Sequence, residues 1–450
     1  AAATFIYLFV LFGSFLNESG AGQFFIDLAR GLAGGTRGGP AKVAVISSAL
    51  MGTVSGSAVA NVVGTGSYTI PLMKSLRYKP AFAGAVEAAA STGGQIMPPV
   101  MGVAAFILAE FVGIPYIKVC AAAALPAVLY FFAILMMVDF EAARTGLVGL
   151  PKEELPDVKQ ILKQGWHLLF PLILVLILLT KGYTPHFTAF WCIIATFLVT
   201  LVRKETRMTP EKVFKALASG ATGAVIIATS CAIAGVIIGV VSLTGLGVKF
   251  TSMVLSFAGG RLPVALFLTM IASLVLGMGV PTTAAYVMVA ALAVPAIVQM
   301  GVNRLAAHLF AFYFACISTI TPPVATSAYA AAGIAKSDPI ETGFLASKLG
   351  VTAFIVPYMF VYGPELLLMG EPLAVVRVVI SSLIGVVALA GGLQGWLLGK
   401  CQLWERVLLV ASALMLIEHN VITDIIGLAV LILVILNQRQ YLPAKQAKSQ

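Results

Sequence analysis

One pattern occurs twice in this chain, 224 residues apart. Pro-Pro-Val stands at residues 98–100 and again at 322–324, and Pro71 maps onto Pro295 by the same shift. Each copy follows a run rich in glycine and hydroxyls, SGSAVAN at residues 55–61 and GMGVPTT at residues 277–283. Glycine and proline disfavour the helices that such apolar sequence would otherwise form. Paired interruptions of this kind are typical of membrane transporters built from internal repeats.

The composition places the chain in a bilayer. Hydrophobic residues make up 60% and charged residues 10%, whereas a soluble domain has about 45–50% and about 25%. The net charge of +10 does not indicate a nucleic-acid partner, because Lys and Arg gather in short loops between apolar segments. The five cysteines form no C-x-x-C pair, which argues against a zinc site or disulfide framework. We therefore expect an all-α polytopic membrane protein.

Counting apolar segments of about 20 residues as crossings predicts an inverted repeat. Five crossings separate two short interrupted hairpins, so the hairpins enter the membrane from opposite sides, and the C-terminus is expected to be cytoplasmic. The expected regions are a first repeat at residues 1–138 (re-entrant hairpin about 40–73, broken transmembrane helix 82–111), a cytoplasmic linker at 139–164, a second repeat at 165–362 (hairpin about 262–299, broken helix 305–335) and a C-terminal transmembrane extension at 363–450.

Three further expectations concern the connecting segments. Residues 139–163 should form the longest charged loop, and an amphipathic surface helix should run from Pro210 to Ser219 before a separate crossing at 221–244. A crossing is also expected near residues 344–362.

The interruptions carry the expected chemistry. Non-helical backbone at membrane depth leaves amides and carbonyls unpaired, and it is tolerated only where it lines a cavity. Carbonyls freed at Gly93, Gly94 and residues 319–321, together with hydroxyls of the two polar runs, would offer neutral oxygens to a small cation such as Na⁺. Helices that restart beyond each run would direct amides toward an anion such as a carboxylate. Side-by-side cation and anion sites predict a symporter, with no other cofactor.

Other interpretations remain open at this point. Small polar residues also allow close helix packing in membranes, and for a single cluster packing is the better explanation. Glu87, inside a predicted crossing, is either a coupling carboxylate or a hydrogen-bonded scaffold contact. Hairpins of this kind also line channels, so an ion channel, or another ion-coupled carrier that needs no binding protein, is the alternative function. Four histidines and no clustered acids argue against an enzyme.

Four motifs resemble one known family. Residues 55–61, 93–100 (GGQIMPPV), 277–283 and 319–325 (TITPPVA) are similar to the large membrane (permease) subunit of tripartite ATP-independent periplasmic (TRAP) transporters, over roughly residues 4–362. The resemblance implies an elevator-type Na⁺ symporter of organic acids, such as C4-dicarboxylates or related carboxylates. It also implies a bacterial or archaeal cytoplasmic (inner) membrane location and a periplasmic substrate-binding protein that delivers the acid.

Carried across, the resemblance also points to site residues. The implied ion-binding residues are Ser55, Ser57, Asn61, Gly93, Gly94, Gly279, Thr282, Thr283, Thr319 and Thr321, and the implied substrate-binding residues are Ser57, Gln95, Pro98, Thr283 and Pro322. Two departures resemble a variant in which the small and large membrane subunits are fused. Nothing here matches the small subunit, and about three crossings follow Glu365. An N-terminal part is thus expected to be missing, and the partner is expected to be a TAXI-type binding protein.

Overall fold

The computed structural model describes residues 7–418 and 420–446, which are helical apart from loops and one isolated β-bridge between Trp396 and Lys400. Within these residues, six helical segments are long and apolar enough to cross a membrane, by length and composition. They are Tyr116–Thr145, Lys152–Thr180, Pro210–Thr244, Pro339–Tyr362, Pro372–Gln394 and Val421–Gln440. The expectation of an all-helical membrane protein with several apolar spans is confirmed.

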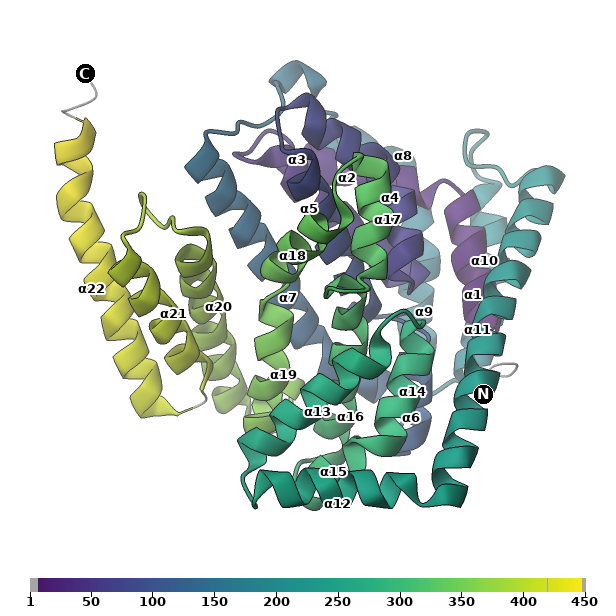
Figure 1. The fold of residues 1–450 in the computed structure, drawn as a ribbon. Coiled ribbons are helices and arrows are strands. Elements are labelled where there is room, and N and C mark those ends of the chain that lie inside the picture. Colours follow the sequence, from purple (N-terminus) through teal and green to yellow (C-terminus); the bar gives the residue numbers. More distant parts are fainter. Residues whose placement is uncertain (1–6, 419, 447–450) are drawn as a thin grey trace.

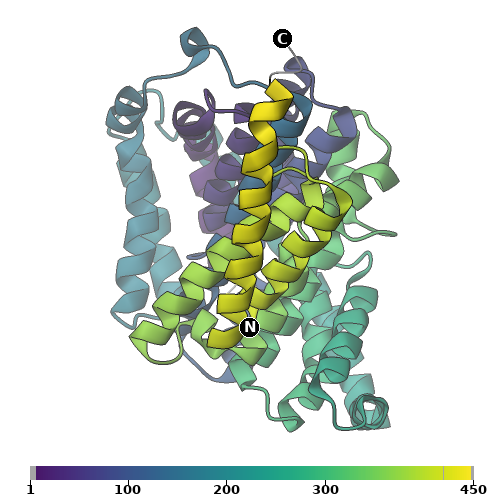
Figure 2. The same cartoon turned by 90° about the vertical axis from the view of Figure 1, so that its left-hand side faces the viewer.

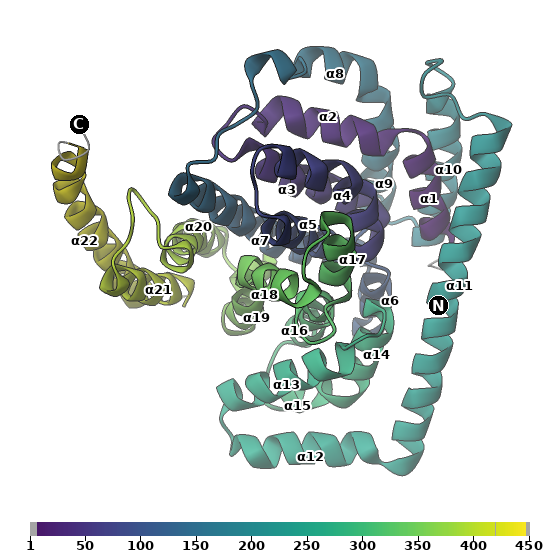
Figure 3. The same cartoon turned by 45° about the horizontal axis from the view of Figure 1, so that its top comes forward.

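Two short helices form the first helix pair. Helix α3 (Gly39–Ser55) packs against α4 (Ala58–Ser75), and residues 56–57, here called the first tip, join them. The next helix, α5 (Pro80–Gly93), lies against both (Figure 3). It is followed by the single turn η2 (Gly94–Ile96) and then α6 (Ala104–Val112). Residues 94–103, between the two helices, are called the first break.

The second half of the chain repeats this order of elements. Helix α13 (Leu262–Gly277) is joined to α14 (Thr282–Leu292) by residues 278–281, the second tip. After α15 (Val294–Gln299), α16 (Arg304–Ile317) leads into η5 (Ser318–Ile320) and α17 (Thr326–Ala335), with residues 318–325 as the second break. The Pro98–Pro99 and Pro322–Pro323 bonds are both cis. In Figure 1 the first helix pair lies in the upper part of the molecule and the second in the lower part.

The core lies along α5 and α16. Every residue of α16 from Leu305 to Ile317 is buried, and so are nearly all residues of α5. Helix α7 (Tyr116–Thr145) packs against α3 and α5, while α18 (Pro339–Leu349) and α19 (Thr352–Tyr362) cover α5 and α16. The first break and the start of the second are therefore enclosed by protein, whereas Pro323 and Val324 of the second break are exposed.

Long helices flank this core on two sides. On one side, α11 (Pro210–Thr244) packs along α1 (Tyr7–Glu18), and α12 (Leu246–Ala258) lies across the lower end of the molecule (Figures 1 and 3). On the other, α20 (Pro372–Gln394) contacts α7 and is followed by α21 (Leu403–Ile417) and α22 (Val421–Gln446), which stand in front in Figure 2. The remaining elements are α2 (Ala21–Ala33), η3 (Lys152–Glu154), α8 (Val158–Gly165), η4 (Trp166–Leu169), α9 (Phe170–Thr180), α10 (Pro185–Thr200) and η6 (Pro364–Leu367).

The expectation that residues 139–163 form a charged loop was wrong in part, because helices α7 and α8 extend into this segment. Helix α7 continues to Thr145, where Arg144 pairs with Glu141 one turn before it. Helix α8 then begins after Asp157, whose side chain caps the amide of Lys159, and it packs on α2. An N-cap and an apolar face are enough to form a helix in a segment whose charge alone predicted a loop.

The separate surface helix expected before residue 221 was wrong. Residues 210–244 form one helix, because glycines such as Gly220 cost only about 1 kcal/mol in a helix and Gly220 allows close contact with Leu11. The crossing expected near 344–362 agrees with the apolar span Pro339–Tyr362, although the helix is divided there into α18 and α19 at Gly350. Helix α12 was not predicted at all. It starts after Gly245, whose left-handed φ of 68° ends α11 and turns the chain.

Candidate functional site

The first tip is built by Gly56 and Ser57. Gly56 has φ 59°, and a Cβ there would lie 2.2 Å from the carbonyl oxygen of Met101 in the first break. Ser57 is extended and caps α4 by accepting a hydrogen bond from the amide of Ala60, at 3.4 Å. The hydroxyl of Ser55 is buried and makes no hydrogen bond within the described part of the chain. A hydroxyl in that position is available to a ligand.

The first helix pair touches the first break through backbone. A Cβ on Gly52 would lie 2.2 Å from Cα of Gly94, and a Cβ on Gly94 would lie 2.9 Å from Nδ2 of Asn61. Asn61 is fully buried and donates from Nδ2 to the carbonyl of Ser48, at 2.9 Å. The sequence therefore needs glycine at both positions, since any side chain would separate the tip from the break.

The second tip approaches the second break in a similar way. Ser318 donates a hydrogen bond to the carbonyl of Gly277 at 3.3 Å, and a Cβ on Gly277 would lie 2.4 Å from the Ser318 hydroxyl. Gly94 and Ser318 are related by the 224-residue offset. Gly279 has φ 73°, which glycine adopts at low cost. Each tip thus rests on the break of its own half.

The two breaks meet each other at the centre of the molecule. The hydroxyls of Thr92, at the end of α5, and Thr319, in η5, lie 3.2 Å apart, and both side chains are buried. Contacts therefore run from Gly52 and Asn61 of the first helix pair through Gly94, Thr92 and Thr319 to Ser318 and Gly277, next to the second tip. Residues more than 220 positions apart in sequence form one polar region.

A second polar network surrounds Glu87, which is fully buried in α5. Its Oε1 accepts hydrogen bonds from Ser48 at 2.8 Å, from Ser91 at 3.1 Å and from Thr65, while Oε2 accepts one from Thr69. These partners come from α3, α4 and α5, so the carboxyl group joins all three helices. Thr65 also lies 2.8 Å from the carbonyl of Asn61, which connects this network to the first break.

Not every predicted site residue faces this region. Ser57 is exposed, and the Thr321 hydroxyl donates to the carbonyl of Ile317, at the end of α16, at 2.9 Å. Gln95, in the first break, is buried, and its Nε2 has no partner among the described residues. Gly93 packs against the Tyr130 ring, 2.3 Å from where its Cβ would lie. Thr283 is buried at the start of α14, and Thr282, Pro98 and Pro322 are half-buried.

Some carbonyls that we expected to be free have partners. The Gly94 carbonyl accepts the amide of Met97 at 3.3 Å, and the Ile320 carbonyl accepts the hydroxyl of Ser347 at 2.8 Å. Each carbonyl oxygen has two lone pairs, so one remains at each.

Sequence reasoning missed several residues of the two networks. Thr92 and Ser318 were not selected because their partners lie far away in sequence. Thr65 and Thr69 do lie at helical spacing from Asn61, on the same face of α4, and that spacing was a usable signal. Together, the neutral oxygens and unpaired amide of this region can bind a small cation and a polar anion.

The comparisons with known proteins agree on one family. The model of "Tripartite ATP-independent periplasmic transporter, DctM component" matches residues 1–372, and a domain of unknown function matches residues 375–430. The 2,3-diketo-L-gulonate TRAP transporter large permease protein YiaN of Escherichia coli is 23% identical over 369 residues, covering 81% of this chain and 85% of that protein.

Two further relatives cover shorter stretches. The sialic acid TRAP transporter large permease protein SiaM of Vibrio cholerae is 29% identical over 196 residues, covering 43% of this chain and 45% of that protein. The C4-dicarboxylate TRAP transporter large permease protein DctM of Pseudomonas aeruginosa is 28% identical over 207 residues, covering 45% and 48%.

Proposed function

Because this chain belongs to the DctM component family of tripartite ATP-independent periplasmic transporters, we propose that it carries an organic acid anion across the membrane together with Na⁺. It is a multi-pass membrane permease and not an enzyme. The observation that supports the proposal is the contact path that joins both tips and both breaks. If a cation and an anion both bind along this path, the binding of each can depend on the binding of the other.

The first tip and first break offer a site for the cation. The unpaired Ser55 hydroxyl, the Asn61 side chain and the remaining lone pair of the Gly94 carbonyl are neutral oxygen donors in a buried place. Sodium is a hard cation and suits such oxygen ligands. A related cation site is proposed at the second tip, with Gly279, Thr282, Thr283 and Thr319.

The anion is proposed to lie between the two tips. The unpaired Nε2 of Gln95 is a buried donor, and the first-turn amides of α4 and α14 lack helical acceptors. Ser57, Pro98, Thr283 and Pro322 complete the proposed boundary of this site. The relatives named above act on a diketo sugar acid, sialic acid or C4-dicarboxylates, all of which carry carboxylates. We propose a carboxylate of this class as the cargo.

The proposed mechanism is of the elevator type. Cation binding orders the tips, the anion site is then complete, and the two helix pairs move with their broken helices as one body against α11, α12 and the other outer helices. The repeats are proposed to be inverted, so that each tip serves one side of the membrane. Glu87 is proposed to support coupling, because its network reaches the first break through Thr65 and Asn61.

Two protein partners follow from the family. A periplasmic binding protein, of the TAXI type suggested by the additional C-terminal helices, is proposed to deliver the acid. A small membrane subunit is proposed to accompany this chain.

Uptake into proteoliposomes tests the proposal. The purified chain, with its small membrane subunit and its binding protein, is offered a panel of radiolabelled carboxylates with and without a Na⁺ gradient. We expect saturable uptake that needs both the gradient and the binding protein. Replacing Ser57 or Thr283 by Phe should abolish uptake and leave membrane insertion unchanged. Normal uptake by both variants would remove the proposed site, and single-channel currents would favour the alternative of a channel.

A further inference from the structure

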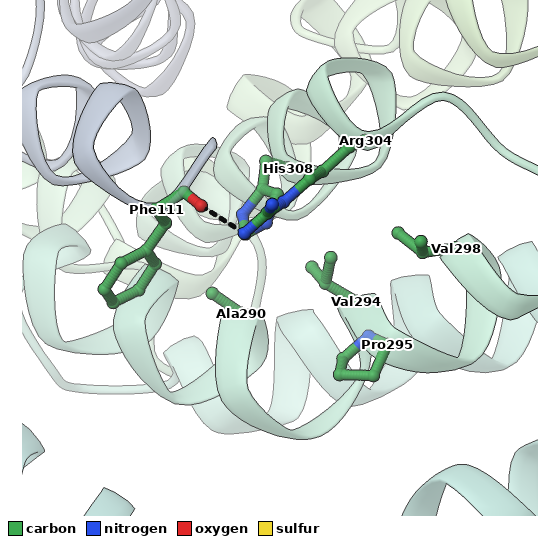
Figure 4. Close-up of a pocket in the computed structure, with 7 residues that line it drawn as sticks. All are labelled: Phe111, Ala290, Val294, Pro295, Val298, Arg304 and His308. Carbon is green, nitrogen blue, oxygen red and sulfur yellow. Dashed lines mark hydrogen bonds between the residues drawn. The ribbon is translucent and has the colours of Figure 1, made fainter. Parts of the chain in front are cut away.

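A pocket away from the tips and breaks lies where α6 ends and α16 begins. Its volume is about 310 Å³. Both halves of the chain line this pocket. The first half supplies the end of α6, and the second half supplies the stretch from α14 to α15 and the start of α16. The lining residues are Phe111, Ala290, Val294, Pro295, Val298, Arg304 and His308 (Figure 4).

Arg304 supplies a positive charge at the rim. It is the first residue of α16, it is exposed, and its Nη2 donates to the carbonyl of Phe111. A guanidinium has five N–H donors, so most remain for another acceptor. Among the ion pairs of the described residues none includes Arg304. No carboxylate of the described residues lies within 4 Å of this cation.

His308 adds a second nitrogen beside Arg304. It is 6% exposed, and its Nδ1 lies 2.9 Å from the hydroxyl of Tyr286. That contact occupies Nδ1 and leaves Nε2 for a ligand. Arg304 and His308 are one helical turn apart on α16, and both line the pocket at the end where Phe111 lies (Figure 4). Val294, Pro295 and Val298 line another part of the pocket, so it has one polar end and one aliphatic wall.

The position of the pocket indicates the depth at which a ligand would bind. Helix α12 packs against α15 and lies across the lower end of the molecule (Figures 1 and 3). Its side chains Val248 and Phe257 are 74% and 72% exposed. A helix that lies flat with exposed apolar side chains is typical of the membrane interface, where lipid phosphates are found.

We propose that this pocket binds one phospholipid molecule. The phosphate contacts Arg304 and Nε2 of His308, and the beginning of an acyl chain follows Val294, Pro295 and Val298. Arginine is well suited to phosphate oxygens, and an aliphatic wall favours an amphiphile over a small hydrophilic acid. Because Arg304 also holds the end of α6, a bound lipid would join the first half to α15 and α16 of the second. The proposal does not depend on which acid is transported.

Native mass spectrometry of the full chain tests this inference. Delipidated protein in mild detergent is titrated with phosphatidylglycerol, and the first bound lipid is counted. We expect Arg304→Gln to weaken that first binding by about tenfold, the effect of one charge-assisted contact. Lys249→Gln is the matched control, since it removes an exposed positive charge from α12 outside the pocket. It should bind the first lipid as the unaltered chain does.

A second variant keeps the test valid if Arg304→Gln fails to fold. Val298→Trp fills the aliphatic wall without changing Arg304, and it too should lose the first bound lipid. Unchanged lipid binding in either folded variant would overturn the proposal. Succinate, added as a carboxylate probe, should not displace the lipid. If succinate displaces it and binds in its place, the pocket is a carboxylate site and the lipid assignment is wrong.

Discussion

The two halves of this chain share a backbone plan and differ in their buried side chains. In the first half, Glu87 is surrounded by the hydroxyls of Ser48, Thr65, Thr69 and Ser91. At the same positions plus 224, the second half has only apolar residues. These are Ala272 for Ser48, Ala285 for Asn61, Val289 for Thr65, Ala293 for Thr69, Ala311 for Glu87 and Ala315 for Ser91.

This difference shows that a broken helix in contact with a tip does not require a buried carboxyl group. Both halves interrupt a helix with Pro-Pro-Val and bring a tip against the interruption, yet only one has a buried carboxyl group. A buried carboxyl network that was not needed could be replaced as a whole by apolar side chains at little cost, and the second half has apolar residues at these positions. We infer that the carboxyl network serves a task specific to the first half. The predictions below test this asymmetry.

The largest effect is expected at Glu87. In Glu87→Leu the hydroxyls of Thr65 and Thr69 can turn to the carbonyls of Asn61 and Thr65. Those of Ser48 and Ser91 can turn to the Thr65 hydroxyl at 3.1 Å and the Ser48 hydroxyl at 3.4 Å. Exchanging four hydrogen bonds to the carboxyl group for weaker ones should cost about 2–4 kcal/mol. Thermal unfolding followed by tryptophan fluorescence should show this loss. Glu110→Leu, which changes an exposed carboxylate on α6, should shift stability by less than about 0.5 kcal/mol.

Glu87→Gln distinguishes a scaffold from a coupling group. The amide keeps an acceptor oxygen and the side-chain shape, so most of the stability should remain. If Glu87 couples ion and substrate movement, uptake should nevertheless fall strongly. Uptake equal to that of the unaltered chain would show that the carboxyl group is only a scaffold.

The next effect compares the two tips. Gly52→Ala places a methyl group 2.2 Å from the backbone of Gly94, which cannot move aside, and should cost about 1–3 kcal/mol and most of the uptake. Gly277→Ala meets the Ser318 side chain instead and should cost less, and adding Ser318→Gly should restore uptake. Gly64→Ala is the control, because its nearest neighbour is a methionine methyl group at 3.9 Å. Equal losses in Gly52→Ala and Gly64→Ala would contradict the proposed contact.

The sequence predicted the tips and breaks better than their partners. Pro and Gly spacing placed the interruptions close to the ends of α3, α5, α13 and α16, because these residues act locally on the backbone. The contact between Thr92 and Thr319 depends on how whole helices pack, and its separation of 227 residues does not follow the 224-residue offset. The hydroxyls around Glu87 come from separate helices, so no single spacing reveals them.

The connecting segments were the least predictable part. The continuous α11 and the transverse α12 depend on neighbours such as Leu11, and a count of apolar residues does not contain that information. The membrane entry sides of the two helix pairs, the region boundaries and the ion and substrate roles of the site residues stay predictions.

A smaller effect measures how strongly the two halves are joined. The Thr92 and Thr319 hydroxyls form one hydrogen bond at 3.2 Å between the breaks. In a double-mutant cycle with Thr92→Val and Thr319→Val, the coupling energy in thermal or chemical unfolding should be about 0.5–1.5 kcal/mol. A cycle of Thr92→Val with Thr321→Val serves as the control, since the Thr321 hydroxyl donates to the carbonyl of Ile317 within the second half. Additive losses in the first cycle would mean that the breaks are not coupled through these hydroxyls.

The smallest change in stability, and the clearest test of ion binding, is expected at Ser55. Its buried hydroxyl has no hydrogen-bond partner in the described chain, so Ser55→Ala should alter unfolding by less than about 0.5 kcal/mol. If the hydroxyl is a cation ligand, its loss should raise the Na⁺ concentration for half-maximal uptake by about tenfold, which corresponds to about 1.4 kcal/mol. Ser67→Ala, on α4 away from the tip, is the control. Its hydroxyl bonds the carbonyl of Val63, and we expect no change in sodium dependence. An unchanged sodium requirement in Ser55→Ala would move the cation site away from the first tip and weaken the case for a functional difference between the two halves.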